Sequence, residues 1–254
     1  MSYQKNEAGT TNNTAGYTLE DVMDSTPTRL TCASVCSIQD CDENAGSQSA
    51  VYTLAIPPVT VFYAYCDMET LNGGWLVIQN RFDGSQEFFN FWIEFKTGFG
   101  DPSGEYWLGN EKMYLLTSAQ TYELYIEMED VDGDTRYVRY SSFALSSESN
   151  GYRLSVSGFS GNVTDSMAYN NGQRFTTKDR DQDMRPSANC ANVFRGSWWY
   201  RSCHHSNLNG FYDPVPGDNP KTMCWKNFTG TVKFTSLRKF RMLIRPVTWC
   251  TKSR

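Results

Sequence analysis

The sequence predicts a globular domain that is dominated by β-sheet and interrupted by two helices. Short runs rich in aromatic and β-branched residues recur through the middle of the chain, separated by Gly, Asn, Asp and Ser. Aromatic residues make up 15% of the chain and hydrophobic residues 39%, which excludes a disordered protein. At 254 residues, the chain can bury a substantial core without a structural metal.

The first 28 residues are polar and rich in Thr, Asn and Gly, which predicts a flexible tail followed by one domain over 29–254. The N-terminus has no apolar leader segment, and no stretch approaches 18 apolar residues, so neither a signal peptide nor a membrane span is visible. We expect a trimmed mature chain or a fragment of a longer protein.

Five runs have the composition of strands. They are VTVFYAYC (59–66), GGWLVIQNRF (73–82), TYELYIEMED (121–130), TRYVRYSSFAL (135–145) and YRLSVSGF (152–159). A first helix is predicted over 85–99, opened by Ser85, with an aromatic stripe that we interpret as core packing (Phe88, Phe91, Trp92 and Phe95). A second is predicted over 110–117, opened by Asn110.

From Met167 to Gly230 the pattern decays into Gly, Asn, Asp, Ser and Pro. A region this irregular inside an ordered domain is usually functional or cross-linked. We therefore expect a loop-rich, ligand-binding subdomain over about 167–254.

The eight cysteines form no pair of C-x-x-C knuckles, so disulfides are favoured over zinc sites. Cys190 and Cys203 are separated by twelve residues, and a disulfide there would stabilise a compact loop by about 3 kcal/mol. Disulfides indicate an oxidising, extracellular compartment. Three N-glycosylation sequons are consistent with secretion, beginning at Asn12, Asn162 and Asn227.

The net charge of -5 gives no general attraction to nucleic acid, but the charges are unevenly distributed. Residues 219–254 carry nine Lys or Arg and no Asp or Glu. Two explanations stay open, which are a solvated strand face and a binding site for anionic glycans or lipids.

Three alternating carboxylates, Asp179, Asp181 and Asp183, repel one another unless solvent or a cation compensates. Their hard oxygen ligands suit calcium. An EF-hand is excluded, because counting from Asp179 puts Met184 where that loop needs Gly and Cys190 where it needs Glu.

The residues do not favour an enzyme. The chain has two histidines, the adjacent His204 and His205, and two neighbouring imidazoles cannot complete a tetrahedral zinc site. The segment GFSGN at 158–162 is not the G-x-S-x-G turn of a serine hydrolase.

Longer motifs give a more specific indication. The segments YCDMETLNGGW (65–75) and VIQNRFDGSQEFFNFWIEFKTGFGDPSGEYWLGNEKMYLLT (77–117), followed by KDRDQD, NCA, WWY, CH, SNLNG and IRP in that order, resemble the fibrinogen C-terminal domain of ficolins, tachylectins, angiopoietins and fibrinogen. The resemblance covers roughly 36–246. It implies an α+β fold built on a mixed, mostly antiparallel twisted sheet, with a C-terminal subdomain that carries calcium and ligand sites.

For calcium, the resemblance implies ligation by the carboxylates of Asp181 and Asp183 and by the main-chain carbonyl of Arg185. A second carbonyl comes from Ser187 or Ala188, since the chain has one extra residue before Cys190.

In relatives that recognise N-acetyl groups, the pocket lies beside the short disulfide, here at Cys203, and next to the following histidine, here His204. The resemblance places Phe194 as an aromatic wall. It also implies a cis peptide bond between Ser202 and Cys203.

Two further pocket positions depart from the acetyl-binding pattern. Asn219 and Pro220 stand where such relatives carry an aromatic residue followed by Ala, and Thr231 stands where an aromatic is often found.

For the remaining cysteines, the family's spacing implies a disulfide between Cys36 and Cys66. A Cys224–Cys250 pair would be an addition to the family's two disulfides, and Cys32 and Cys41 would pair with each other or with a partner chain.

Together these observations predict a secreted, calcium-binding, lectin-like protein of the innate-immune type that binds acetylated or anionic carbohydrates. The alternative is an extracellular structural or signalling module that binds a protein receptor through the same face. An aromatic-lined pocket at His204 would favour sugar, and a filled or flat face would favour protein. Because weak lectin sites gain avidity by clustering, a homo-oligomer is also expected.

Overall fold

The fold is known from a computed structural model that describes residues 48–56 and 60–248. In chain order its elements are β1 (Ala50–Ile56), β2 (Thr60–Asp67), η1 (Thr70–Asn72), β3 (Trp75–Arg81), α2 (Trp92–Thr97), β4 (Phe99–Gly100), β5 (Tyr106–Trp107), α3 (Asn110–Ala119), β6 (Tyr122–Asp130), β7 (Thr135–Leu145), η2 (Glu148–Asn150), β8 (Leu154–Gly161), α4 (Cys190–Phe194), β9 (Ser206–Asn207), β10 (Cys224–Lys226) and β11 (Phe234–Pro246). The predicted tail over 1–28 lies outside the described residues, as do Cys32, Cys36 and Cys41.

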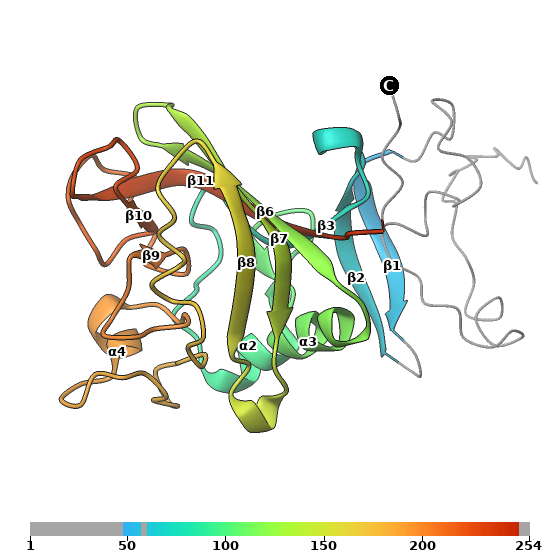
Figure 1. The fold of residues 1–254 in the computed structure, drawn as a ribbon, viewed down its shortest axis with the longest axis horizontal. Helices are drawn as coiled ribbons and strands as arrows, with labels where there is room; N and C mark the ends of the chain where they lie inside the picture. Colours follow the sequence, from blue (N-terminus) through green and yellow to red (C-terminus); the bar gives the residue numbers. More distant parts are fainter. Residues whose placement is uncertain (1–47, 57–59, 249–254) are drawn as a thin grey trace, which may run out of the picture.

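A single large sheet forms the body of the molecule, with its main strands in the order β1-β2-β3-β11-β6-β7-β8 (Figure 1). Every pair of neighbouring strands in the described part of the chain is antiparallel. The five predicted strands are present as β2, β3, β6, β7 and β8, and the predicted α+β class is confirmed. The loop-rich segment with α4, β9 and β10 lies at one end of the sheet, away from the β1–β2 hairpin.

The central strand β11 explains the uneven charge of the C-terminal region. β11 pairs with β6 along its length, so its basic residues face the acidic residues of the sequence YELYIEMED. Arg238 and Lys239 contact Glu129, and Arg245 contacts Glu123 at 2.7 Å. Arg241 is paired as well, so the four basic residues of β11 form an ion-paired strand face within the fold.

The first predicted helix starts later than expected. The helix α2 begins at Trp92, and the residues from Ser85 onward form a loop, because other groups bind their backbone amides. The buried carboxylate of Glu105 accepts hydrogen bonds from the amides of Phe82, Asp83, Gly84 and Gln86. The aromatic stripe packs into the core as predicted, except Phe91, which is 50% exposed.

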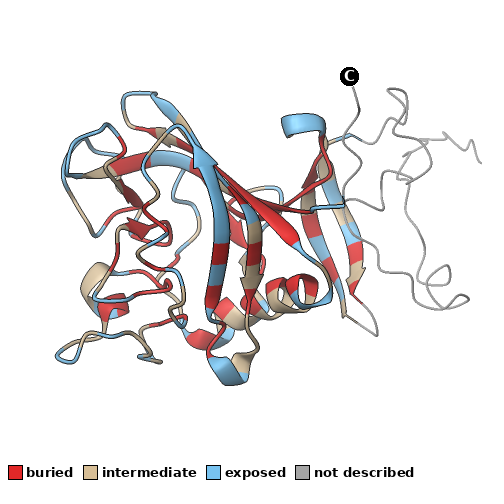
Figure 2. Cartoon of the chain, viewed as in Figure 1, coloured by how far each residue is buried: buried red, intermediate tan, exposed pale blue. Residues whose placement is uncertain are grey.

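The core is continuous from the sheet into the loop-rich region (Figure 2). Trp198 and Trp199 are completely buried although they lie outside the named helices and strands, and Trp225 of the short strand β10 is completely buried as well. The loop-rich subdomain is therefore held by aromatic packing and by a cross-link, which gives its loops a fixed geometry.

Candidate ligand and calcium site at the short disulfide

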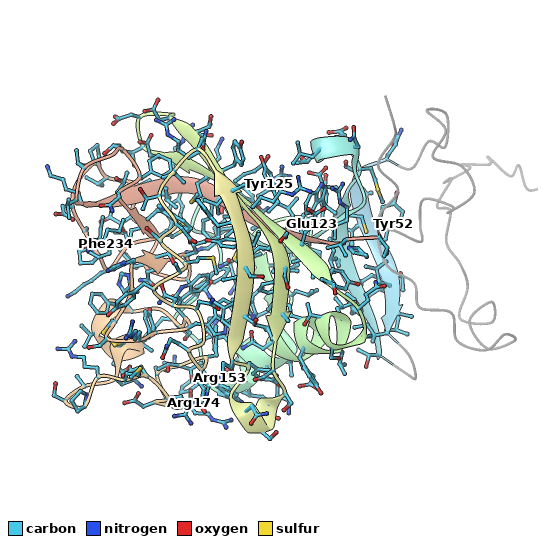
Figure 3. The ribbon with its side chains drawn as sticks, in the orientation of Figure 1. Tyr52, Glu123, Tyr125, Arg153, Arg174 and Phe234 are labelled. Carbon is cyan, nitrogen blue, oxygen red and sulfur yellow. A yellow bond between two sulfur atoms is a disulfide. The ribbon has the colours of Figure 1, made fainter. Side chains whose placement is uncertain are left out.

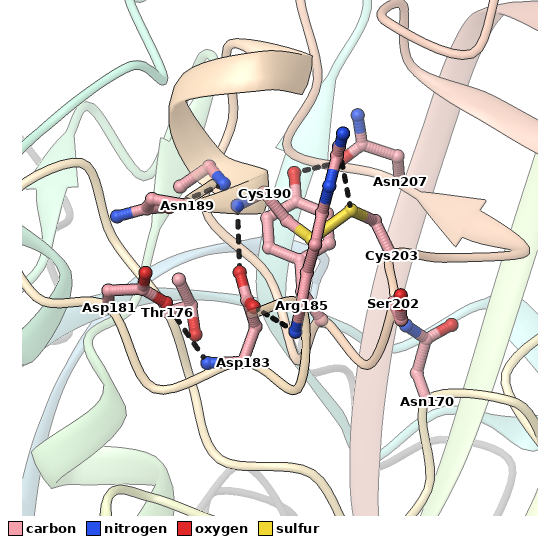
Figure 4. The surroundings of a disulfide bond; sticks show 12 residues. Asn170, Thr176, Asp181, Asp183, Arg185, Asn189, Cys190, Ser202, Cys203 and Asn207 are labelled. Atoms are coloured by element: carbon pink, nitrogen blue, oxygen red, sulfur yellow. Dashed lines mark hydrogen bonds between the residues drawn. A yellow bond between two sulfur atoms is a disulfide. The ribbon is translucent and has the colours of Figure 1, made fainter. Parts of the chain in front are cut away.

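The disulfide between Cys190 and Cys203 is formed as predicted, and it joins α4 to the segment that precedes His204. The peptide bond between Ser202 and Cys203 is cis, as the resemblance implied. The amide of Arg201 donates to the carbonyl of Cys203 at 2.6 Å, and the amide of Met184 donates to the carbonyl of Arg201 at 2.8 Å. The acidic loop and the disulfide loop are therefore one connected structure (Figure 4).

The three carboxylates of the acidic run have different environments. Asp179 accepts hydrogen bonds from the amide of Trp92 at 2.9 Å and from the hydroxyl of Thr177 at 2.7 Å, so it caps α2 and is engaged away from the loop. Asp183 accepts from the amides of Arg185 and Cys190, both at 2.7 Å. Asp181 is exposed and accepts one long bond of 3.3 Å from the amide of Asp183.

The carboxylate of Asp183 lies in an environment that opposes negative charge. Burial raises its pKa, the two backbone hydrogen bonds oppose that effect, and the neighbouring charge of Asp181 raises the pKa further. A bound cation would compensate this charge.

The donor set fits calcium better than a transition metal. Across the described residues, no three His, Cys, Asp or Glu side chains come together in a metal-binding cluster. Two carboxylates must therefore be completed by carbonyls or water, which is the ligand set that calcium accepts. The carbonyls of Arg185, Ser187 and Ala188 accept no hydrogen bond from any described donor, so they are free for such a role.

His204 is the buried polar centre of the predicted ligand site. Its side chain is 5% exposed and is enclosed by the rings of Phe194, Tyr200 and Phe234, with centroid distances of 4.6, 5.7 and 5.3 Å. Neither ring nitrogen makes a hydrogen bond of normal geometry with a described residue, although the backbone of Pro220 is close enough to raise the pKa of the ring slightly. Burial, and secondarily the adjacent His205, lowers the pKa of His204 to about 3, so the ring is neutral.

Sequence reasoning missed Phe234 as a wall of this site. It opens β11 and lies opposite Lys226 of β10, and Figure 3 shows it at the loop-rich end of the sheet. The available signal was the hairpin between Trp225 and β11, because its register brings Phe234 next to His204. Phe234 thus supplies the aromatic wall that Thr231 does not.

The two positions that depart from the acetyl-binding pattern form a turn. The side chain of Asn219 accepts from the amide of Lys221 at 3.1 Å, and its carbonyl accepts from the hydroxyl of Thr222 at 2.8 Å. The carbonyl of Pro220 accepts weakly from the thiol of Cys224 at 3.7 Å. Neither residue adds an aromatic wall.

The predicted Cys224–Cys250 disulfide is wrong in this structure, because Cys224 is a buried free thiol. Cys224 pairs with Ser236 near the start of β11. Cys250 lies outside the described residues. Cys66 is disulfide-bonded, and its predicted partner Cys36 lies outside the described residues.

A family model for the C-terminal globular domain of fibrinogen beta and gamma chains matches residues 36–247. The chain belongs to this family. Microfibril-associated glycoprotein 4 of Homo sapiens is 47% identical over 186 residues, which cover 68% of this chain and 71% of that protein. Fibrinogen C domain-containing protein 1 of Macaca fascicularis is 43% identical over 195 residues, which cover 73% of this chain and 44% of that protein. This fibrinogen-related chain thus spans less than half the length of the latter relative.

Solved structures agree with this assignment. The fibrinogen-like domain of human ANGPTL6 superposes with a TM-score of 0.76 at 40% identity, covering 87% of this chain and 99% of that one. A lamprey fibrin D-dimer, solved with the peptide Gly-His-Arg-Pro-amide, superposes with a TM-score of 0.74 at 30% identity, covering 88% of this chain and 75% of that one. Among the relatives, microfibril-associated glycoprotein 4, the angiopoietins and angiopoietin-related protein 6 are extracellular proteins. In the part of the chain that the structure describes, no helix is long and apolar enough to cross a membrane.

Proposed function

We propose that this fibrinogen-related chain is a secreted, calcium-dependent recognition module that binds a carbohydrate at His204. The observation that carries the proposal is a buried neutral imidazole whose nitrogens make no hydrogen bond of normal geometry, walled by three aromatic rings beside the cross-linked acidic loop. Leaving a buried polar group unsatisfied costs about 1 to 3 kcal/mol, and a sugar hydroxyl or acetamide would remove that cost. The proposal does not involve catalysis.

Calcium would be held by the carboxylates of Asp181 and Asp183 and by the carbonyl of Arg185, with Ser187 or Ala188 as the next carbonyl. The ion would supply positive charge that neutralises the acidic loop. Its effect on ligand binding would be indirect. The carboxylate of Asp183 accepts a hydrogen bond from the amide of Cys190, and this bond fixes the disulfide loop that carries His204.

The charges around the disulfide favour an anionic sugar within the carbohydrate class. The guanidinium groups of Arg185, Arg195 and Arg201 make no ion pair with a described carboxylate, unlike those of β11. Arg185 contacts the Sγ of Cys203 at 3.9 Å, which puts one of these charges at the edge of the site. A carboxylated or sulfated sugar would complement them.

A glycan array with and without a calcium chelator tests this function. The matched pair His204→Gln and His205→Gln separates the buried imidazole from its neighbour, which stacks on Tyr169 at 4.1 Å. We expect binding that the chelator and His204→Gln abolish and that His205→Gln preserves. Binding that is indifferent to His204→Gln would remove the lectin interpretation.

A protein receptor is the second candidate, because His204 is only 5% exposed behind its aromatic walls, and a carbohydrate would reach the imidazole only after these rings move. Apolar side chains are exposed on the loops that carry the site, with Met184 at 59% and Val215 at 57%. Such residues are usual anchors at protein interfaces. Failure to bind any glycan, together with saturable binding to cell-surface protein that Met184→Asp and Val215→Asp abolish, would favour this candidate.

A further inference from the structure

A concave surface that includes neither the disulfide nor His204 lies on the main sheet. It is a groove of about 600 Å³ lined by residues of β3, β11, β6 and β7 and by Asn162. The proposed carbohydrate function makes no use of it.

The groove has aromatic walls that are accessible to solvent. Tyr137 and Phe82 are 40% and 36% exposed, and the ring of Tyr137 lies 5.7 Å from that of Tyr125. Figure 3 places Tyr125 on the upper part of the sheet. Exposed aromatic faces beside polar groups are typical of a ligand surface.

The charged groups around the groove, apart from the buried Arg81, are already paired within the fold. Lys239 lies 3.6 Å from Glu129, Arg136 lies 3.7 Å from Asp134, and Arg241 is paired with Glu127. Because these pairs neutralise one another, the groove suits a neutral, hydroxyl-rich ligand rather than an anion or a cation.

One of the three sequons lies at the edge of this groove. Asn162 lines it, is exposed, and is bound to Tyr137 by two hydrogen bonds. The amide of Tyr137 donates to the Oδ1 of Asn162 at 2.8 Å, and the amide of Asn162 donates to the carbonyl of Tyr137 at 3.2 Å. The Oδ1 is thereby fixed, while the Nδ2 has no partner among the described residues.

Asn227 has a different environment, although it also begins a sequon. Its Oδ1 is buried without a partner, and its backbone is in the left-handed region with φ at 62°. The next residue, Phe228, is buried. The two described sequons therefore offer an internal comparison.

We propose that Asn162 carries an N-linked glycan and that the first sugars of this glycan lie in the groove against Tyr137. The inference rests on the proposed secretion but not on ligand binding at His204. The Nδ2 of Asn162 would form a bond to the anomeric carbon of an N-acetylglucosamine, and the bond from that carbon to the phosphate of a lipid-diphosphate oligosaccharide donor would break. The lipid diphosphate leaves, and the Nδ2 gives up one proton.

This reaction takes place on the chain before the domain folds, so the folded structure need only accommodate the product. It does so, because the hydroxyl side chain of Thr164 and the Asn162 amide nitrogen both lie at an exposed turn after β8. The apolar face of the first sugar would cover the exposed ring of Tyr137, and its polar groups would face the ion pairs of the rim.

The test uses the full chain secreted from mammalian cells behind a secretory leader. Peptide mass spectrometry should find Asn162 modified in the wild type and in Thr229→Ala, which removes the Asn227 sequon. Thr164→Ala, which keeps the Asn162–Tyr137 hydrogen bonds, should lose that glycan. Secreted, folded protein that is unmodified at Asn162 would overturn the proposal, whatever the glycan array shows.

The position of the glycan is tested by its rate of release from native protein by a peptide N-glycosidase. We expect Tyr137→Ala to speed release severalfold, and the control Tyr63→Ala to leave it unchanged, because Tyr63 is an exposed aromatic on β2. Equal release rates from wild type and Tyr137→Ala, with both fully released after denaturation, would overturn the groove contact.

Discussion

Replacing Asp181 by alanine removes a carboxylate predicted to bind calcium while leaving the rest of the fold almost untouched. Asp181 is exposed, and its one hydrogen bond, from the amide of Asp183, is 3.3 Å long. Its loss should change the calcium-free stability by about 0.5 kcal/mol or less. Removing its charge also eases the raised pKa of Asp183.

The effect of calcium follows from binding linkage. Calcium at about 100 times its dissociation constant stabilises the folded state by about 2.7 kcal/mol. For a domain of this size, about 2 to 4 °C per kcal/mol gives a rise in Tm of about 5 to 11 °C. Asp181→Ala should lose most of that rise.

Differential scanning fluorimetry with calcium and with chelator measures both the calcium-free Tm and the rise in Tm that calcium causes. Asp179→Ala is the matched control from the same acidic run, because its carboxylate caps α2. Asp179→Ala should lower the free energy of unfolding by about 1 kcal/mol, and therefore the Tm, both with calcium and with chelator. It should keep the full rise in Tm that calcium causes. An Asp181→Ala protein with an undiminished calcium response would refute the assignment of the ion site.

Three further predictions concern buried polar groups. Glu105→Ala should destabilise the domain by more than about 3 kcal/mol in urea unfolding, because four backbone amides lose their acceptor; a loss below 1 kcal/mol would contradict this role. Arg245→Met alone should cost about 1.5 to 3 kcal/mol, since the 6% exposed carboxylate of Glu123 loses its buried partner and keeps only the half-exposed Arg139, and adding Glu123→Leu should recover part of that loss; additive losses in the double-mutant cycle would argue against coupling. The pKa of His204 is about 3 in the folded state and about 6.5 in the unfolded chain, so below pH 6.5 only the unfolded chain binds the extra proton. The free energy of unfolding should therefore fall by about 1.4 kcal/mol for each pH unit below 6.5. His204→Gln should remove that part of the acid sensitivity between pH 7 and pH 5, and equal losses in the two proteins would contradict it.

The strands could be predicted from the sequence because their signal is local. The run TRYVRYSSFAL coincides with β7, since β-branched and aromatic residues suit a pleated surface whatever lies beyond it. The start of α2 could not be predicted, because it depends on Glu105 and Asp179, which are distant in sequence and bind the amides that would otherwise begin a helix.

The meaning of the basic C-terminal region likewise depended on pairing. Nine basic residues without a carboxylate have the composition of an anion-binding tail. The register between β11 and β6 places acidic partners opposite several of them. Charge composition alone does not determine strand order, so the ion-paired face could not be foreseen.

At the candidate site, motif resemblance placed Phe194, His204, the disulfide and the cis bond where the structure has them. It did not identify Phe234, because a hairpin register decides which aromatic residue meets His204. The Cys224–Cys250 pairing was wrong, because Cys224 is a buried free thiol.

Titration calorimetry of the calcium-loaded chain with an acidic, N-acetylated oligosaccharide tests the central claim most directly. The proposed site predicts saturable binding that a chelator and His204→Gln abolish, and that His205→Gln leaves within about twofold, or 0.4 kcal/mol. Heat of binding that survives His204→Gln unchanged would contradict a carbohydrate site at the buried imidazole.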